Sequence, residues 1–500
     1  MNAETDVPTV IFPPTERHSV FLDLTLGQVL VLGPAASLAF GAVYILQDLA
    51  SVLFAVTVVT LAVTAAFLHV RIGTTRRTAV EWAPIAGTWV WESLPTGAGV
   101  RRHVRALPSR IRPETGGVVE PYPSPGAGPL RGISIWSGIL PDGSPFGAVL
   151  DRPAGRWLAL VEVRGRHVAM VDNPEMLTLQ RKWGALANGL GRQSATVSRM
   201  AWSASSGPVD DLSATWWLRT HAVVDSSDPS VQAQEELIAG GGHAAPEHRL
   251  VLVLAVDANR AKRMIAVQGG GREGAVKVLA DEVERFQGSV KGAGLTVVGV
   301  LDQRAVAATL RLAFDPPEAE KLAVLTEGGS PGLSPTAAGP QFWDVHLDYL
   351  VTSTTFHIAG VVDEWPGAEM PVDFLVPLLE DPSIQRRITQ VLVPLTPLQA
   401  MSYVGTKLHD VEVQKQVRER WGFLAGRAKH ERAEDAAREE DRAIARSGVN
   451  QEATVLVVSA PTLEKAEAAW AQLELAAAGS FIRLERATGM QEDVFLASLP

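Results

Sequence analysis

Cysteine is absent from this chain of 500 residues. Its absence excludes disulfides, zinc sites built on thiolates and catalysis by a cysteine nucleophile. It also fits a protein that works in a reducing compartment.

Motifs for the commonest enzyme chemistries are missing as well. The sequence has no G-x-x-x-x-G-K-[ST] loop, in which backbone amides and a lysine hold nucleotide phosphates. It has no H-E-x-x-H and no H-R-D kinase catalytic loop. We therefore predict that the protein is not an enzyme and has no catalytic, cofactor-binding or metal-binding residues.

Basic residues are outnumbered by acidic ones. The chain has 45 Lys and Arg against 55 Asp and Glu, for a net charge of −10. This charge opposes nonspecific binding to nucleic acids. We expect no direct sequence-specific binding to them either.

Apolar residues, by contrast, are abundant near the start of the chain. Residues 24–70 form two apolar runs of roughly 22 residues each, and Gln47 and Asp48 separate them. Each run is long enough to cross a hydrocarbon core of about 30 Å. No side chain of the first run is charged, and in the second run only His69, at its very end, could be. The pattern predicts a two-helix transmembrane hairpin within residues 21–72, with the lipid bilayer as its partner.

Two other interpretations of this apolar stretch were weighed. A signal peptide has a basic start and an apolar region of about 7–15 residues. Here the stretch is too long and doubled, and the residues before it are net acidic. A buried hairpin in a globular core stays open as an alternative. Because Arg71, Arg76 and Arg77 follow the second run, we expect a multi-pass protein of the cell membrane with both termini in the cytoplasm.

The remainder of the chain, roughly 400 residues, suggests two or three further domains. Residues 1–20 are predicted to be a cytoplasmic tail, and residues 73–129 a basic, tryptophan-bearing segment and linker. Strands and helices alternate within residues 130–326 and again within residues 341–500. We predict an α+β fold class, with cytoplasmic α/β-plait domains of mixed or antiparallel sheets.

In the first soluble domain, turn residues separate three apolar runs, which predicts a three-stranded meander. Asn173 and Pro174 have the residue types of a helix cap and a first helical residue. The predicted strands are 132–140, 146–151, 156–165, 195–203, 249–257 and 295–300, and the predicted helices are 173–190, 230–239, 259–268, 273–291 and 303–314.

In the second soluble domain, a long charged helix is predicted at 397–446. It mixes both signs of charge, as solvated helices do, so we interpret its pair Glu439–Glu440 as solvated. Residues 491–500 are predicted to be a tail. The other predicted strands are 341–351, 353–362, 386–395, 453–460 and 480–486, and the other predicted helices are 372–379 and 463–478.

Gly269, Gly271 and Gly274 form a G-x-G-x-x-G pattern. A dinucleotide site needs this pattern between a strand and a helix, with an acidic residue about 20 residues later. The nearest suitable acid, Asp302, lies 28 residues past Gly274, and the residues before the glycines have a helical pattern. We therefore interpret the glycines as a break between two helices.

Asp344, His346 and Asp348 alternate along the predicted strand 341–351 and so would share one face. Two carboxylates and an imidazole could hold a metal ion. We favour the simpler interpretation, that these residues form the polar face opposite a buried apolar face.

The end of the chain resembles a known family. The pattern Q-E-x-x-F-L-x-S-L-P at 491–500, after a strand, a helix and a strand, resembles the end of the amino-terminal region of the conjugation ATPases of type IV secretion, the CagE/TrbE family. Residues 361–367, 371–379 and 421–440 are consistent with it. The front of the chain resembles the PrgI-like two-span membrane subunit of the same machines. No catalytic residue is carried over, because in that family the P-loop motor follows this region.

The resemblance implies a motorless, actinobacterial inner-membrane scaffold of a conjugative DNA-transfer or type IV-like secretion apparatus. Its implied partners are a separate P-loop ATPase and other membrane channel subunits, within an oligomeric complex. One alternative is an EccE-like core membrane subunit of a type VII secretion system. A membrane-tethered dinucleotide-binding enzyme that uses Gly269, Gly271 and Gly274 is the other.

Overall fold

The structure is a computed structural model of the whole chain. The predicted helix 397–446, most of the tail 1–20, most of the first apolar run and most of the segment 73–129 lie outside the described residues, so those predictions stay predictions. The described residues are 9–10, 19–21, 24–25, 37, 41, 44, 49–67, 71–72, 77–78, 103–105, 118–119, 129–165, 171–193, 196–207, 218, 222–225, 227–241, 247–319, 322, 332–366, 370–371, 374–379, 381, 384–395 and 450–500.

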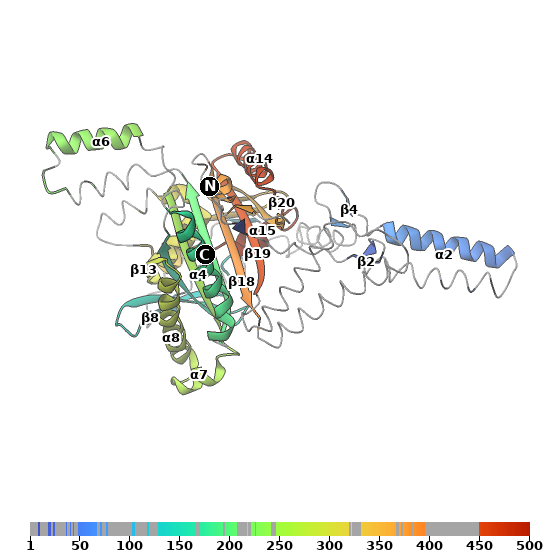
Figure 1. Cartoon of the computed structure of the whole chain (residues 1–500), viewed down its shortest axis with the longest axis horizontal. Helices are drawn as coiled ribbons and strands as arrows, with labels where there is room; N and C mark the ends of the chain where they lie inside the picture. Colours follow the sequence, from blue (N-terminus) through green and yellow to red (C-terminus); the bar gives the residue numbers. More distant parts are fainter. Residues whose placement is uncertain are drawn as a thin grey trace, which may run out of the picture. The chain divides into compact units, whose positions relative to one another are not determined.

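The chain divides into two compact units. The first unit comprises residues 1–12, 100–400 and 442–500, and the second comprises residues 13–99 and 401–441. A large antiparallel sheet with helices on both faces builds the first unit (Figure 1). The prediction of a mixed α+β protein with antiparallel sheet is thereby confirmed.

Strands of both predicted soluble domains lie in one sheet of 14 strands. Its order is β6-β14-β15-β16-β19-β18-β11-β12-β10-β9-β8-β7, with β13 added on β10 and β20 on β16. The pair that joins the two segments is β11 with β18, in which Met200 lies opposite Leu392. The 130–326 and 341–500 segments thus share a sheet.

The first half of this sheet comes from residues 133–314. Its elements are β8 (Ile133–Ile139), β9 (Pro145–Asp151), β10 (Arg156–Arg164), α4 (Asn173–Gln193), β11 (Val197–Gly207), α6 (Pro229–Gly241), β12 (Glu247–Asp257), α7 (Lys262–Val267), α8 (Gly271–Gly292), β13 (Thr296–Val300) and α9 (Gln303–Phe314).

The second half comes from residues 342–497. Its elements are β14 (Phe342–Val345), β15 (Leu350–Thr352), β16 (Phe356–Glu364), β17 (Met370–Pro371), α11 (Val376–Leu379), β18 (Gln385–Pro394), β19 (Asn450–Ala460), α14 (Leu463–Gly479), β20 (Arg483–Arg486) and α15 (Gln491–Ala497). The edge strands β6 (His103–Arg105) and β7 (Val118–Val119) flank the two halves.

The two halves repeat one topology. Counted outward from the central pair, β11-β12-β10-β9-β8 on one side matches β18-β19-β16-β15-β14 on the other, and β13 on β10 matches β20 on β16. Individual main-chain hydrogen bonds also correspond between the two halves. The N–H of Leu301 donates to the C=O of Leu160 at 2.9 Å, as that of Ala487 does to Ala359 at 2.9 Å. Because the central pair is antiparallel, a local two-fold relates the halves.

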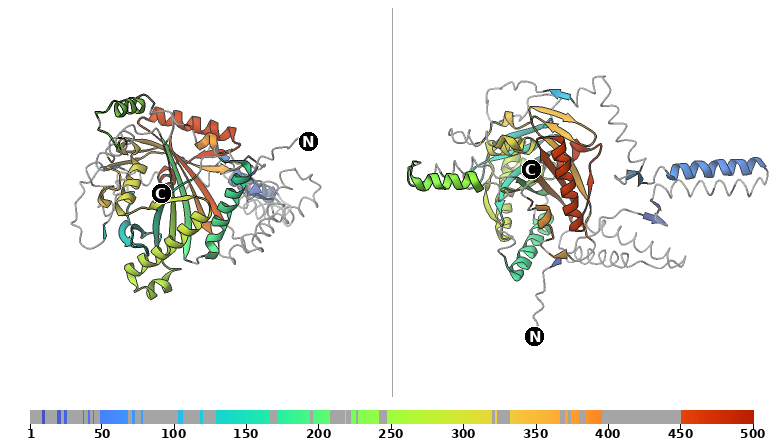
Figure 2. Two further views of the ribbon diagram at one scale, coloured as in Figure 1. Left: turned by 60° about the vertical axis from the view of Figure 1, so that its left-hand side comes forward. Right: turned by 90° about the horizontal axis from the view of Figure 1, so that it is seen from above.

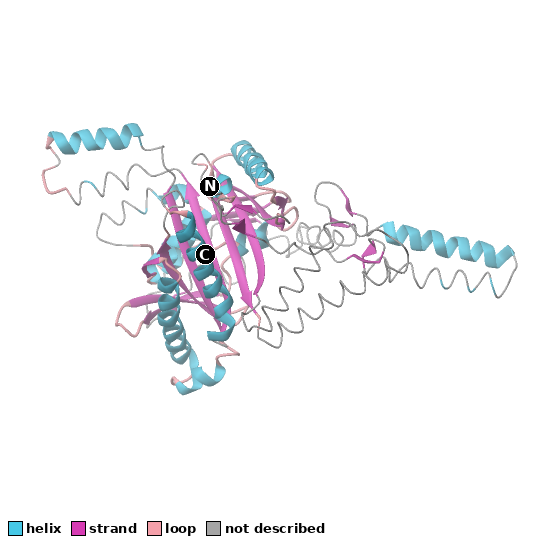
Figure 3. Cartoon of the chain, viewed as in Figure 1, coloured by secondary structure: helices cyan, strands magenta, loops and turns pink. Residues whose placement is uncertain are grey.

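Helices cover both faces of the sheet (Figures 2 and 3). On one face, α4 and α8 pack on β10, β11 and β12, while α11 and α14 pack on β16, β18 and β19. On the other face, α9 and α15 share one core that draws side chains from both halves. Phe314, Trp343 and Phe495 meet there, with ring centroids 5.5 to 5.7 Å apart. This shared core makes the halves a single unit.

Most predicted strands and helices of the first unit are present, with shifted ends. Three predictions are wrong in detail. The strand 341–351 is broken by a turn between β14 and β15, residues 491–500 contain the helix α15, and the cap of α4 is Asp172. Its carboxylate accepts from the N–H of Glu175 at 3.0 Å, so Asn173 and Pro174 lie inside the first turn.

In the second unit, the helix α2 covers Leu49–Phe67 and has no acidic residue in its first turn and no basic residue in its last. Two short hairpins accompany it, β2 (Ser19–Phe21) with β3 (Leu24–Thr25) and β4 (Arg71–Ile72) with β5 (Arg77–Thr78). The described part of the chain contains no helix long and apolar enough to span a membrane.

Candidate functional site

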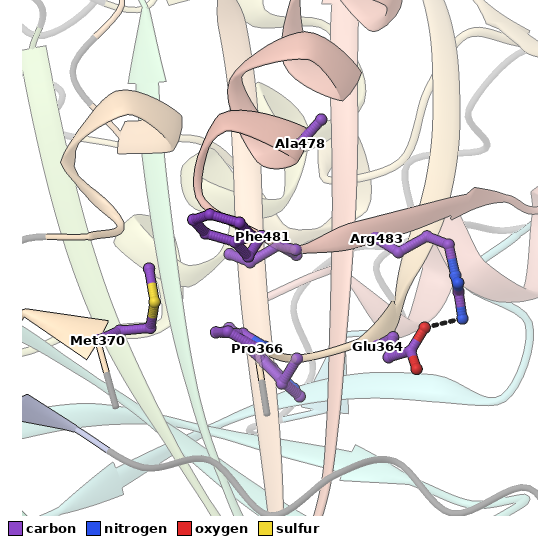
Figure 4. Close-up of a pocket in the computed structure, with 8 residues that line it drawn as sticks. Glu364, Pro366, Met370, Ala478, Phe481 and Arg483 are labelled. Atoms are coloured by element: carbon purple, nitrogen blue, oxygen red, sulfur yellow. Dashed lines mark ion pairs between the residues drawn. The ribbon is translucent and has the colours of Figure 1, made fainter. Parts of the chain in front are cut away.

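A cavity of about 400 Å³ lies beside the end of α14, in the second half of the sheet unit. Most of its wall is apolar, and an ion pair closes one side (Figure 4). Its volume falls within the range of about 300–1,000 Å³ that ligand-binding pockets occupy. The lining residues are Glu364, Trp365, Pro366, Met370, Ala478, Phe481, Ile482 and Arg483.

Phe481 forms the rim of this cavity with an unusual backbone. Its φ of 56° makes it the one non-glycine residue with positive φ in the described part of the chain. The cause is the end of α14: the N–H of Phe481 donates to Ala478 at 3.0 Å and that of Ile482 to Ala477 at 2.8 Å. This Schellman ending normally has glycine at the left-handed position. The Phe481 side chain is 73% exposed, so burial does not offset the strain.

The charged side of the cavity holds one carboxylate and one guanidinium, those of Glu364 and Arg483. Nε of Arg483 bonds a carboxylate oxygen of Asp363 at 3.0 Å, and its other end pairs with Glu364. Two carboxylates therefore face one guanidinium. Glu364 is 47% exposed, so its charge is open to a bound group.

Met370 connects this cavity to the start of the chain. It lies in β17, which pairs with β1 (Thr9–Val10) in an antiparallel two-stranded sheet. Val10 lies opposite Met370. An extended segment from a distant part of the sequence is thus already seated at one wall of the cavity.

A second cluster of chemically interesting groups lies in the core. Nε2 of His357 donates to the carbonyl of Phe314 at 2.8 Å, so Nδ1 is left to accept from the hydroxyl of Ser459 at 2.8 Å. Thr352 lies 3.0 Å from Nε2 and donates to Asp315 at 2.8 Å. The pattern has the residue types of a nucleophile with its base.

Its environment makes this cluster structural. His357, Asp315 and Thr352 have no exposed surface. Burial, with the positive charge of Arg387, lowers the pKa of His357 to about 3, against the weaker opposing effect of the Phe314 carbonyl. A base with so low a pKa takes a proton poorly near neutral pH. The cluster ties the end of α9 to β15, β16 and β19.

Arg387 connects the same core to the last residues of the chain. Its guanidinium donates to the hydroxyl of Ser498 at 2.8 Å and to the carbonyl of Ala313 at 2.9 Å. It also lies 5.1 Å from the ring of Phe495. Burial lowers the pKa of Arg387 to about 9, so it stays charged at neutral pH. Phe495 and Ser498, two residues of the Q-E-x-x-F-L-x-S-L-P pattern, are therefore buried where the end of the chain meets the sheet.

The glycine pattern lies between two helices. Gly269, Gly270 and Gly271 all have positive φ and connect α7 to α8. A Cβ on Gly274 would lie 2.5 Å from the carbonyl oxygen of Ile265, so this glycine lets the two helices approach. Asp302 caps α9 and accepts from the N–H of Ala305 at 2.7 Å. These roles agree with the interpretation of a break between helices.

The alternation of Asp344, His346 and Asp348 is not maintained, because β14 ends at Val345. His346 enters a turn in which its N–H donates to Tyr349 at 2.9 Å and its ring stacks on that of Tyr349. Nε2 of His346 lies 3.1 Å from a carboxylate oxygen of Asp344. In the described part of the chain no three acidic or histidine side chains are grouped as metal ligands.

Sequence reasoning missed the cavity. Phe481 fell within the predicted strand 480–486, and its left-handed backbone follows from the way α14 ends. No model of a known protein family matches the chain, and no curated protein is similar to it.

Proposed function

We propose that the protein is an inner-membrane scaffold subunit of a conjugative DNA-transfer or type IV-like secretion apparatus. In this proposal the apolar stretch 24–70 anchors it, and the α+β unit docks a separate P-loop ATPase. The observation that carries the proposal is the exposed apolar surface of α2.

The middle of α2 presents large apolar side chains to its surroundings. Leu53 is 60% exposed and Leu61 is 65% exposed, while Ala55 and Ala62 are buried. The other exposed apolar side chains there are Val52, Phe54, Val56 and Val59. Such a contiguous apolar surface is costly in water and favourable in lipid.

Two threonine side chains of α2 have hydrogen-bond acceptors within the helix. The hydroxyl of Thr57 donates to the carbonyl of Leu53 at 2.9 Å, and that of Thr60 to Val56 at 2.7 Å. Groups without water nearby need such internal partners. This bonding supports a lipid environment for α2.

The docking part of the proposal rests on the resemblance of residues 491–500 to the conjugation ATPases. Gln491, Phe495 and Ser498 are the residues that hold α15 on the sheet. The pattern is therefore structural in this chain, which supports a shared fold at this point and carries no catalytic role. In the alternative proposal, a core membrane subunit of a type VII secretion system, the same apolar stretch anchors the chain, but its partners are the other core subunits of that system.

Membrane extraction tests the anchor. We expect the full chain to stay in the membrane pellet after an alkaline carbonate wash. A double variant, Val56→Arg with Leu61→Arg, places two charges on α2 at about 2.5–3.5 kcal/mol each and should be released. Leu475→Arg, at an exposed position of α14, is the matched control and should stay in the pellet. Release of the unaltered chain would overturn the anchor.

Cross-linking in the native host tests the partner. We expect a P-loop ATPase to be recovered with the detergent-solubilised chain. Recovery of type VII core subunits would favour the alternative machine, and a complex without any ATPase would remove the docking role while leaving the anchor in place.

A further inference from the structure

The connection between β12 and α8 is a feature that the repeat of the two halves does not account for. In the second half, only Pro461 and Thr462 separate β19 from α14. In the first half, residues 258–270 separate β12 from α8, and they include the additional helix α7. Because the second half turns from strand to helix without such a helix, the fold itself does not require α7.

The outer face of α7 combines apolar and basic side chains. Val267 is 87% exposed and Met264 is 40% exposed. Lys262 and Arg263 are also exposed, and within the described part of the chain neither forms an ion pair. Arg263 lies four residues and Met264 three residues before Val267, so the three are neighbours on one helix face. Ile265 packs against the core instead, which turns this face away from the sheet.

The surroundings of α7 are basic, although the whole chain is acidic. Residues 257–281 carry five basic and three acidic side chains, a net charge of +2, whereas the chain has a net charge of −10. The carboxylate of Asp257 accepts a main-chain N–H of the following turn at 2.8 Å, and that of Asp281 accepts from Nε2 of Gln268 at 3.3 Å. The third acidic residue, Glu273, lies in the first turn of α8. The protein's own carboxylates therefore do not balance the charge around α7.

The position of α7 links it to the unit that contains α2. The guanidinium of Arg260, just before α7, lies 3.5 Å from the carbonyl of Val197, the first residue of β11. Antiparallel pairing places Pro394, at the end of β18, and Asn450, at the start of β19, at this same end of the sheet. Between them, residues 401–441 belong to the unit of α2. One connection to that unit thus leaves the sheet at the end where α7 lies (Figure 1).

We infer that α7 docks this end of the sheet on the anionic headgroups of a phospholipid bilayer. Lys262 and Arg263 bind headgroup phosphates, while Met264 and Val267 enter the boundary between the headgroups and the acyl chains. A bilayer is favoured over an acidic protein because the connection at this end leads to α2, whose exposed apolar surface suits lipid. The inference rests on the proposed function, since the bilayer is the one that holds α2.

A single fluorescent label tests the inference, because the chain has no cysteine that would compete for it. The full chain with Val267→Cys carries an environment-sensitive dye and is incorporated into vesicles of phosphatidylcholine, with or without phosphatidylglycerol. We expect a blue shift of the emission and weaker quenching by acrylamide in the vesicles that contain phosphatidylglycerol. The same dye on Ala468→Cys, an exposed position near the start of α14, should stay accessible to acrylamide in both.

Charge variants of the labelled chain test the basic residues. Each basic residue near an anionic surface strengthens binding about fivefold, so Lys262→Ala with Arg263→Ala should lower the ratio of docked to free α7 about 25-fold. Lys291→Ala with Lys465→Ala removes the same charge at the opposite end of the sheet and should leave the emission unchanged. All four lysine and arginine side chains are exposed, so we expect the melting temperatures of both variants to match that of the unaltered chain.

Flotation of the vesicles separates this inference from the proposed anchor. A chain that floats while its label at position 267 stays open to acrylamide would overturn the inference and leave the anchor in place. A chain that floats only with phosphatidylglycerol, and only when Lys262 and Arg263 are present, would support docking and remove the anchor. A chain that floats with neither kind of vesicle would overturn both. An equal blue shift without phosphatidylglycerol, or in the Lys262 and Arg263 variant, would overturn the role of the anionic headgroups.

Discussion

The side-chain amide of Gln491 bonds both main-chain groups of Ala359. Its Oε1 accepts from the N–H at 2.8 Å, and its Nε2 donates to the C=O at 3.1 Å. A side chain from α15 thus takes the place of a neighbouring strand at the middle of β16. Gln491 is 1% exposed, so water cannot replace it.

Removing this amide should destabilise the first unit. We expect Gln491→Ala to lower the free energy of unfolding by about 2–3 kcal/mol, because it removes two buried hydrogen bonds and leaves the N–H of Ala359 without a partner. Urea unfolding followed by far-ultraviolet circular dichroism measures the change. Gln268→Ala, at an exposed residue, is the control and should change stability by less than about 0.5 kcal/mol.

Gly294 and Phe481 are the left-handed residues after α8 and α14, and both helices end in the same pair of main-chain hydrogen bonds. Exchanging these two residues should have opposite effects on stability. Gly294→Phe forces a bulky residue into a left-handed backbone and displaces Leu179, so we expect a loss of about 3 kcal/mol. Phe481→Gly relieves strain and should gain about 0.5–1 kcal/mol. Parallel melting curves of the two variants measure both changes, and losses of equal size would contradict the correspondence.

Acid should weaken the fold through His357. Its pKa in the folded state, about 3, lies below the unfolded value of 6.5, so the unfolded chain binds the proton first. The contribution of neutral His357 to the free energy of unfolding is fully present above about pH 6.5. It falls by about 1.4 kcal/mol per pH unit as the pH drops towards 3.

Denaturant titrations between pH 7.5 and pH 4.5 check this dependence. His357→Gln cannot take up the proton. The slope of its free energy of unfolding against pH should therefore be smaller by up to about 1.4 kcal/mol per pH unit. Identical slopes for this variant and the unaltered chain would argue against His357 as the acid-sensitive group.

The glycine pattern should matter for packing and not for a dinucleotide. A Cβ at Gly274 meets the backbone of Ile265, whereas one at Gly288 of the same helix meets nothing within 4 Å. We expect Gly274→Ala to cost about 1–3 kcal/mol and Gly288→Ala to gain about 0.5–1 kcal/mol. Titration with NAD should leave the melting temperature of the unaltered chain unchanged, and a rise would revive the enzyme alternative.

Local signals in the sequence predicted the elements of the first unit well. The turn at 141–144 forms as its residues suggest, with Asp142 accepting from the N–H of Ser144 at 2.9 Å and Gly143 at φ of 87°. The helix α9 begins at the residue after Asp302, because that aspartate has the side chain of a cap. Such features depend on neighbours in sequence.

Features that depend on distant residues were not predictable. Nothing in Met200 or Leu392 by itself indicates that β11 and β18 pair and join the two halves. The burial of residues 491–500 follows from partners more than 100 residues away, such as Ala359 and Arg387. The cavity could not be predicted for the same reason, because its walls come from separated segments of the chain.

The local two-fold of the sheet also places two long connections at opposite ends of its central strands. Each half has its longest connection at the same step, after β11 in the first half and after β18 in the second. Because these strands are antiparallel neighbours, the two connections leave from opposite ends of the sheet, about 30 Å apart at the rise per residue of such strands. One of them, through residues 401–441, belongs to the unit of α2. The pairing of β11 with β18 therefore fixes the distance between these two exits, from Gly207 to Pro394, at about one strand length.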